Sequence, residues 1–458
     1  MRVSGTKLGA FLIIFLSCTI SNTVLSGNGT TEIVSVDSAG IQGNGFSGRP
    51  SISQDGRYVA FPSFASNLVP GDTNGEQDIF VHDRDTGLTE RVSVNSDGIQ
   101  GNSDAETTSI SPDGRYVAFS SWANNLVPAD TNGAIDVFVH DRNTGLTERV
   151  SVDRAGAQGN DHSQAPSISQ DGRYVAFHSR ATNLVTGDTN NTQDVFIHDR
   201  DTGLTERVSV DSAGIQGNLI SGGPSISQDG RYVAFYSIAN NLVPGDTNQR
   251  NDVFVHDRGT GLTERVSVDS AGIQGNFISG GPSISQDGRY VAFSSDANNL
   301  VPGDTNNALD VFVHDRQTGL TERVSVDSAG IQGNSSSFDS SICQEGRYVA
   351  FSSLARNLVP GDTNLWDVFV HDRVTGLTEQ ISVDSVGTEG NSESLMPSIS
   401  QDCRYVTFYS YATNLVPDDT NGATDVFVRT RIDGGETLFK SSFEGVAVLG
   451  GVSPEADE

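Results

Sequence analysis

Three groups of residues in this chain could perform chemistry. The first group is six His-Asp-Arg triplets, which begin at His82, His140, His198, His256, His314 and His371. The second is a recurring loop such as "GDTNGEQD" at 71–78, whose carboxylate and amide oxygens are ligands that Ca²⁺ prefers. The third comprises His162, His178 and Arg180, and these two histidines are the only ones outside the triplets. Histidine can bind a metal or transfer protons near neutral pH.

The triplets recur because most of the chain is a repeat. The segment "SISQDGRYVAF" at 51–61 returns six times in close variants, at spacings of 58 residues five times and then 57. A residue present in every copy is explained most simply by what every copy needs. Because the triplets fall in six different copies, they cannot converge on one substrate. We therefore interpret them as hydrogen-bonded strand ends, and note that the seventh copy has Arg429 instead of histidine.

Each copy is predicted to contain four short strands, here called A to D. In residues 108–152 they are "TSIS", "RYVAFSS", "DVFVHDR" and "LTERVSV". Successive side chains of a strand point to opposite faces of its sheet, and in strand B apolar residues stand on both. Both faces of the sheet should therefore be buried. The sequence thus predicts an all-β, seven-bladed β-propeller with four antiparallel strands per blade. The propeller should span 31–432, with blades beginning near residues 50, 108, 166, 224, 282, 340 and 397.

Closure of the ring requires an outer strand for the last blade. The segment "TEIVSV" at 31–36 matches strand D without its own A, B and C strands, so we expect this N-terminal strand to close the ring. A competing candidate is "ETLFKSS" at 436–442 in the predicted C-terminal tail, residues 433–458.

The first 26 residues are predicted to be a signal peptide. Arg2 and Lys7 precede the apolar run "LGAFLIIFLSCTI", which is shorter than the ~20 residues that span a bilayer. The protein is therefore expected in the periplasm or outside the cell, with a lipoprotein anchored at Cys18 as the alternative. A net charge of −30 makes nucleic acid a poor partner. We expect a monomer without a membrane span.

The repeat resembles a known family. Pro-Ser-x-Ser-x-Asp-Gly-Arg-Tyr-Val-Ala-Phe, followed by Asp-Val-Phe-Val-x-Asp and a Thr-Gly turn, resembles the TolB-type, WD-repeat-like β-propeller repeats of exported bacterial proteins. The resemblance covers residues 31 to about 432 and implies the propeller fold. It implies little about activity, because propellers perform binding, scaffolding and enzymatic roles. We expect neither the extra N-terminal domain of TolB nor the hydrolase domain of propeller peptidases in this chain.

The aspartate-rich loops allow two interpretations. Oxygen side chains at positions 1, 3 and 7 suit calcium, whereas Asx turns would satisfy nearby backbone groups without a metal. Blade 6 has a shorter loop, so Asp362 and Asp367 are only five residues apart. No cofactor is required by this interpretation, and calcium is an open prediction. The predicted ligands are Asp72, Asn74, Asp78, Asp130, Asn132, Asp136, Asp419, Asn421 and Asp425.

The loops between blades vary on one face of the predicted ring. In a propeller the A–B and C–D turns lie on one face and the B–C and D–A loops lie on the other. The first pair is short and uniform here, and the second pair is long and differs between blades. Diversity on a uniform scaffold is typical of a binding surface, although drift in tolerant loops is the alternative. The candidate ligand-binding residues are Phe64, Trp122, His162, His178, Arg180, Tyr236, Tyr409 and Tyr411.

Two functions follow from this pattern. The first is a non-enzymatic module that binds a protein, peptide or glycan through the variable loops. The sequence shows no nucleophile–base–orienter set and no cofactor fingerprint that would favour an enzyme. The second is a metal-assisted enzyme resembling propeller polysaccharide lyases, with His162 and His178 as ligands and Arg180 recognising a carboxylate.

Two cysteines fall in adjacent blades near the uniform face. Cys343 replaces a serine of strand A in blade 6, and Cys403 replaces the turn glycine in blade 7. An exported protein permits a disulfide, but sequence cannot establish the Cα separation below ~7 Å that the bond needs. Free thiols are expected, with a disulfide as the alternative.

Overall fold

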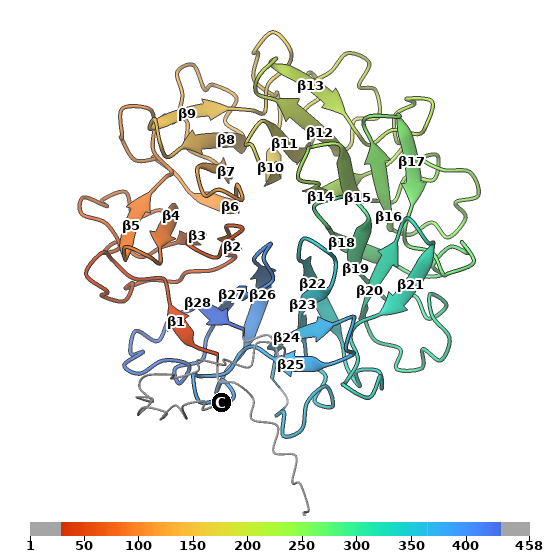
Figure 1. The fold of residues 1–458 in the computed structure, drawn as a ribbon. Coiled ribbons are helices and arrows are strands. Elements are labelled where there is room, and N and C mark those ends of the chain that lie inside the picture. Colours follow the sequence, from red (N-terminus) through yellow and green to blue (C-terminus); the bar gives the residue numbers. More distant parts are fainter. Residues whose placement is uncertain (1–28, 364, 432–458) are drawn as a thin grey trace, which may run out of the picture.

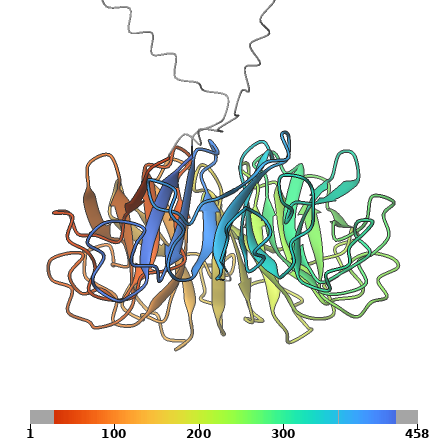
Figure 2. The ribbon, with the colours of Figure 1, turned by 90° about the horizontal axis from the view of Figure 1, so that it is seen from below.

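The computed structural model of the protein describes residues 29–363 and 365–431. Every regular element in this range is a strand, and the strands form seven antiparallel sheets of four. The sheets stand around a common axis (Figure 1), and Figure 2 shows the ring edge-on as a disc one blade thick. The predicted seven-bladed β-propeller is confirmed. The predicted signal peptide and C-terminal tail, including "ETLFKSS", lie outside the described residues.

The two inner strands of each blade, A and B, are joined by the turn of the repeated hairpin. Strand A is β2 (Ser51–Ile52), β6 (Ala105–Ile110), β10 (Ser163–Ile168), β14 (Ser221–Ile226), β18 (Ser279–Ile284), β22 (Ser337–Ile342) and β26 (Ser394–Ile399). Strand B is β3 (Tyr58–Ser63), β7 (Tyr116–Ser121), β11 (Tyr174–Ser179), β15 (Tyr232–Ser237), β19 (Tyr290–Ser295), β23 (Tyr348–Ser353) and β27 (Tyr405–Ser410).

The two outer strands complete blades 1 to 7 in the same order. Strand C is β4 (Asp78–Asp83), β8 (Asp136–Asp141), β12 (Asp194–Asp199), β16 (Asp252–Asp257), β20 (Asp310–Asp315), β24 (Asp367–Asp372) and β28 (Asp425–Thr430). Strand D is β5 (Leu88–Arg91), β9 (Leu146–Arg149), β13 (Leu204–Arg207), β17 (Leu262–Arg265), β21 (Leu320–Arg323), β25 (Thr378–Gln380) and, in blade 7, β1 (Thr31–Ile33). The described residues contain no helix with the length and apolarity that crossing a bilayer requires.

The N-terminal strand closes the ring, as predicted. β1 pairs antiparallel with β28, and Ile33 lies opposite Phe427. The Thr430 amide donates a hydrogen bond of 2.9 Å to the Thr30 carbonyl. The two ends of the described chain therefore lie side by side in blade 7.

The apolar core lies between blades and not within them. Seven clusters of buried side chains occur in the described residues, and each draws members from two adjacent blades. In one of them Ala60 and Val81 of blade 1 pack with Phe119 and Phe138 of blade 2. The two phenylalanine rings stack with centroids 5.8 Å apart. Each blade thus depends on its neighbours for burial of both faces.

The His-Asp-Arg triplets hold strands together. His82 Nδ1 lies 2.9 Å from Thr89 Oγ1 across β4 and β5, and burial lowers the pKa of this histidine. The Arg57 guanidinium donates two hydrogen bonds, of 2.8 and 2.7 Å, to the Asp83 carboxylate. This bidentate pair holds the pKa of Asp83 well below its usual range. The triplets are structural, as their recurrence predicted.

The arginine of each triplet reaches the preceding blade. Arg84 lies over the Tyr405 ring, 4.5 Å from its centroid, and donates hydrogen bonds to the Gly56 carbonyl and to Glu32. A Cβ atom on Gly56 would lie only 2.1 Å from Tyr405 Cδ2, so the turn must carry glycine to admit the ring. The same stacking repeats around the ring for the triplet arginines Arg142, Arg200, Arg258, Arg316 and Arg373, and for Arg431, which holds this position in blade 7.

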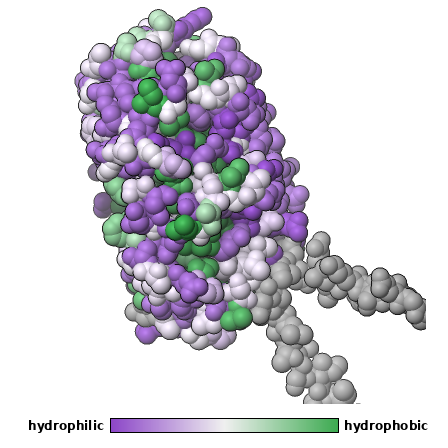
Figure 3. Space-filling model, turned by 90° about the vertical axis from the view of Figure 1, so that its left-hand side faces the viewer, coloured by the Kyte–Doolittle hydropathy of each residue, from purple (hydrophilic) through white to green (hydrophobic). Residues whose placement is uncertain are grey.

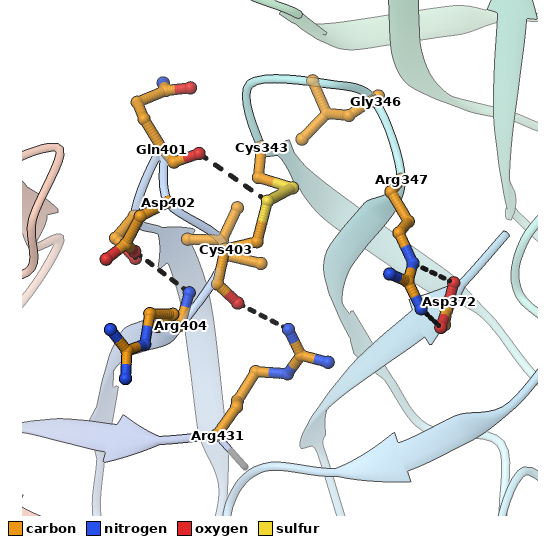
Figure 4. The surroundings of a disulfide bond; sticks show 12 residues. Cys343, Gly346, Arg347, Asp372, Gln401, Asp402, Cys403, Arg404 and Arg431 are labelled. Carbon is orange, nitrogen blue, oxygen red and sulfur yellow. Dashed lines mark hydrogen bonds and ion pairs between the residues drawn. A yellow bond between two sulfur atoms is a disulfide. The ribbon is translucent and has the colours of Figure 1, made fainter. Parts of the chain in front are cut away.

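A disulfide joins blades 6 and 7, so the expectation of free thiols was wrong. Cys343 and Cys403 are bonded, with Cα atoms 5.4 Å apart (Figure 4). The physical reason is that the A–B turn of each blade packs against the preceding blade, as Gly56 packs against Tyr405. Cys403 occupies the turn position at which a Cβ atom points into the preceding blade, as the ideal Cβ on Gly56 does. Strand A of that blade ends beside Cys343, and the Arg431 guanidinium donates to the Cys403 carbonyl at 2.6 Å.

Phe119→Ala should lower the free energy of unfolding by about 3–5 kcal/mol, because it removes buried area and leaves a cavity between two blades. Equilibrium unfolding in guanidinium chloride measures this loss. A loss below about 1 kcal/mol would mean that the shared clusters do not hold the ring together.

The disulfide can be removed by restoring the residues that the other blades carry. The double variant Cys343→Ser, Cys403→Gly should be less stable than the oxidised wild type by up to about 4 kcal/mol, the loop-closure value for a separation of 60 residues. Cys403→Ser alone should be less stable still, since a serine would keep the positive φ of 64° without the crosslink. Thermal unfolding measures both, and an unchanged midpoint in the double variant would contradict a stabilising role.

Candidate ligand-binding face

The variable loops share one face because main-chain hydrogen bonds join them. In blade 1 the Phe64 amide, after strand B, donates to the Phe46 carbonyl before strand A at 2.9 Å. The Arg180 amide donates to the His162 carbonyl in blade 3 in the same way, also at 2.9 Å. Each B–C loop is therefore fixed to the D–A loop of its own blade. Their side chains project from a rigid edge of the sheet.

A bulge in strand A directs further residues to the ring axis. In β10 the pairing register shifts between Gln164 and Ser167, and Ala165 has a φ of 51° before Pro166. The equivalent residues surround an opening of about 350 Å³, which we call the channel mouth. Its lining is Arg49, Pro50, Thr107, Thr108, Ala165, Pro166, Gly223, Pro224, Gly281, Pro282, Asp339, Ser340, Met396 and Pro397.

A larger hollow, which we call the aromatic cleft, lies beside the channel mouth between blades 7, 1 and 2. Its volume is about 570 Å³. Phe46, Phe64 and Tyr411 expose 56%, 49% and 48% of their surface there. The Tyr409 and Tyr411 rings meet edge to face, with centroids 6.4 Å apart, and burial raises the pKa of Tyr409. The full lining is Phe46, Ser47, Gly48, Arg49, Pro62, Phe64, Gln77, Asp104, Glu106, Thr107, Tyr409, Tyr411 and Thr424.

A second hollow of about 220 Å³, the histidine cleft, lies over blades 2 and 3. The structure brings four of the predicted residues together in it. The lining is Trp122, Ile135, His162, Gln164, His178, Arg180 and Gln193.

The histidine at the entrance of this cleft is held by an aromatic contact and a backbone group. The His162 ring packs at 69° against the indole of Trp122, with centroids 5.0 Å apart. Its Nδ1 accepts a hydrogen bond of 3.0 Å from the Ile135 amide. Because Nδ1 is occupied, Nε2 is the nitrogen of His162 that a ligand could use.

The second histidine is half-buried and neutral near pH 7. His178 Nδ1 lies 3.5 Å from the Gly223 amide, and burial, reinforced by the charge of Arg180, lowers the pKa of His178 to about 4. The Arg180 side chain is exposed and has no hydrogen-bond or ion-pair partner among the described residues. The cleft therefore offers a neutral imidazole beside an unpaired cation, which suits an anionic or polar ligand group.

Glu106 connects the two clefts. Its carboxylate accepts hydrogen bonds from Trp122 Nε1 at 3.1 Å and from Gln164 Nε2 at 3.3 Å, while the same residue lines the aromatic cleft. Sequence reasoning did not single out Glu106, Phe46 or Arg49. Their signal was present in the variable segments "GFSGR" and "SDAET" before strand A, but only the folded ring shows which positions face a cleft.

The eighth predicted ligand-binding residue has a different environment. Tyr236 covers the glycines of its own blade, since a Cβ on Gly222 would lie 2.8 Å from the Tyr236 Oη atom. It lines neither the aromatic cleft nor the histidine cleft.

The predicted calcium loops of blades 1 and 2 carry a protein cation. Arg91 Nη1 lies 3.1 Å from Asp72 Oδ1 and 3.0 Å from Asp78 Oδ2. The Asn74 side chain donates its amide to Asp78 at 3.0 Å, and its oxygen accepts from a backbone amide. Blade 2 repeats this arrangement with Asp130, Asn132, Asp136 and Arg149. Calcium in these loops stays a prediction.

In blade 7 an amide takes the place of the arginine. Gln42 Nε2 donates hydrogen bonds of 2.7 Å to both Asp419 Oδ1 and Asp425 Oδ2. Asn421 also donates to Asp425, at 2.9 Å. Burial raises the pKa of Asp425 to about 6.

Comparison with known proteins shows the fold. No protein-family model matches the chain, and no curated protein matches its sequence. An oligogalacturonate lyase from Vibrio parahaemolyticus shares 13% identity over 89% of this chain and 98% of its own, with a TM-score of 0.52. The β-propeller domain of the Trilobed protease from Pyrococcus furiosus shares 11% identity over 85% of this chain and 96% of its own, also at 0.52. A putative TolB from Agrobacterium tumefaciens shares 18% identity over 61% and 80%, with a TM-score of 0.38.

The lowered pKa of His178 predicts that stability depends on pH. Its pKa is about 4 in the folded chain and about 6.5 when unfolded, so as pH falls from 6.5 to 4 the unfolded state binds the proton first. Wild type should lose stability over this window faster than His178→Ser, which carries the residue of blades 2, 5 and 6. The difference should be at most about 1.4 kcal/mol per pH unit. Thermal unfolding at several pH values measures this difference. The contributions of the six triplet histidines to the pH dependence cancel in it, because both proteins have them.

Proposed function

We propose that this protein is an exported, non-enzymatic module that binds a protein, peptide or glycan across the aromatic and histidine clefts. The observation that carries the proposal is the set of aromatic side chains left half-exposed around one concave surface. Phe46, Phe64, Trp122 and Tyr411 each expose between 42% and 56% of their surface on that face. Large aromatic groups are costly to leave in water and serve as contact anchors when a partner covers them.

The clefts also supply polar groups that could orient a ligand. Arg49 and Glu106 line the aromatic cleft, and Arg180 lines the histidine cleft without an ion-pair partner among the described residues. The aromatic cleft has the volume of a typical ligand site, and its apolar and charged groups converge as such sites require. An extended ligand could contact blades 7, 1, 2 and 3 in succession.

The rest of the surface provides the contrast. On the opposite face the exposed apolar residues at the C–D turns are the same leucine in almost every blade, such as Leu88 and Leu146, and Val374 in blade 6. Figure 3 shows the part of the rim on the left of Figure 1, where apolar side chains are separated by hydrophilic ones. Residue variety and concavity therefore coincide on the loop face, and the net charge of −30 disfavours nucleic acid there.

A metal-assisted polysaccharide lyase is the second candidate. It is favoured by the meeting of His162, His178 and Arg180 in one cleft, and an oligogalacturonate lyase shares the fold. Its support is weaker, because each imidazole Nδ1 faces a backbone amide. Among the described residues, the groups of three or more close metal-ligating side chains include neither histidine. Release of unsaturated products from polygalacturonate with Mn²⁺, lost in His162→Ala, would favour the lyase over the binding module.

Trp122→Ala, Tyr411→Ala and Arg180→Ala should each weaken binding at least about tenfold, as expected for removal of an anchor at a binding surface. Stability should change by less than about 0.5 kcal/mol, since these side chains are exposed. Glycan and peptide arrays probed with the full chain identify a ligand, and calorimetry then compares the variants. Leu146→Ala, equally exposed on the opposite face, is the matched control and should bind normally. The proposal fails if the three variants unfold or all bind as wild type does.

A further inference from the structure

Every blade sets two aspartates against each other at the start of strand C, and this pair needs compensation. In five blades an arginine at the end of strand D supplies it, with N–O distances of 3.0 to 3.7 Å. These arginines are Arg91, Arg149, Arg207, Arg265 and Arg323. Two carboxylates and one guanidinium leave a formal charge of −1 at each such position.

Blade 7 loses the arginine but keeps an amide donor. Ile33 occupies the arginine position in β1, and Gln42 donates hydrogen bonds to both aspartates of that blade. The pair is therefore still hydrogen-bonded, although it has no cation.

Blade 6 has neither the arginine nor the glutamine that donates to both aspartates. Gln380 stands at the arginine position and Glu389 stands where the other blades have the glutamine. Asp362, Asp367 and Glu389 thus place three carboxylates together, with oxygen atoms that all lie within 4.8 Å of one another. The formal charge at this position is −3 instead of −1.

Two carboxylate oxygens of this group in blade 6 are buried and lack partners among the described residues. Asp367 is fully buried, and its Oδ1 accepts a hydrogen bond of 2.7 Å from Ser382. Its Oδ2 is buried without a hydrogen-bond partner among the described residues, and so is Asp362 Oδ1. The Gln380 amide lies beside this carboxylate, but within 29–363 and 365–431 its Nε2 also completes no hydrogen bond. An unpaired buried carboxylate oxygen is costly, and here it belongs to a group of three acids.

A divalent cation would return the formal charge at this position from −3 to −1, the value in the five arginine-containing blades.

We propose that blade 6 binds one Ca²⁺ through Asp362, Asp367 and Glu389, at the position where other blades use arginine. Carboxylates are the hard oxygen ligands that Ca²⁺ prefers, and its flexible coordination of six to eight oxygens tolerates a half-buried site completed by water. Glu389 Oε1 also accepts hydrogen bonds from the Thr363 amide and hydroxyl, at 3.2 and 2.7 Å, which fix it against the loop. The cation would join the B–C loop, strand C and the D–A loop of one blade.

Calorimetric titration of CaCl₂ into the full-length protein, stripped with EDTA and desalted, tests this. Wild type should bind one Ca²⁺ per chain, and its melting temperature should rise by several degrees with Ca²⁺. Glu389→Gln and Gln380→Arg each install the residue of other blades, and each should weaken this binding at least tenfold. Both should melt in EDTA no lower than wild type does, since each supplies the missing donor.

The matched control is Gln158→Glu in blade 2, which adds the same carboxylate while Arg149 remains. It should bind no additional Ca²⁺. The proposal is overturned if wild type binds no Ca²⁺ at millimolar concentration, or if Ca²⁺ binds with undiminished affinity when both blade 6 variants are tested. Either variant alone suffices for the comparison if the other fails to fold.

Discussion

Burial of both faces of every blade against its neighbours is the constraint on which this structure depends. Since each apolar cluster is shared, as Ala60 and Phe119 share one, no blade can bury both of its faces without its two neighbours. The contact also sets local chemistry. The turn glycine, such as Gly56, is required by the ring of Tyr405 that packs on it, and Arg84 then covers that ring. Repetition in the sequence is thus a consequence of identical interfaces, and ring closure by β1 leaves none of them exposed.

The same constraint separates the two faces of the disc. The A–B and C–D turns carry the interblade contacts of tyrosine and arginine, so they cannot vary without loss of packing. In the B–C and D–A loops, main-chain bonds such as that from the Phe64 amide to the Phe46 carbonyl fix the variable positions. Side-chain bonds such as that from Asn67 Nδ2 to the Gln42 carbonyl join repeated residues. The main-chain bonds leave the side chains at the variable positions free to differ. Aromatic and charged residues can therefore accumulate around the two clefts at little cost to the fold.

The fold could be predicted from the sequence because it depends on the repeat of about 58 residues and on the pattern of apolar residues in the strands. The grouping of His162, His178, Arg180 and Trp122 was partly visible, since equivalent positions in adjacent blades must lie near each other. What escaped prediction depends on contacts between distant residues. Asp72 resembles a metal ligand until Arg91, nineteen residues later, is seen against it. Likewise the pairing of Cys343 with Cys403 follows from the direction of one Cβ atom, which only the blade interface reveals.

Departures from the repeat are informative because their surroundings are fixed by the neighbouring blades. A change at a constrained position must be compensated close by. Cys403 at the glycine position is compensated by a bond to Cys343, and Ile33 at the arginine position by the Gln42 amide. Gln380 and Glu389 are different, since together they remove a cation and add an anion, and within the described residues no side chain restores the balance. The compensation for blade 6 must therefore come from solution, as a proton or as a metal ion, and three carboxylates whose oxygen atoms converge favour the ion.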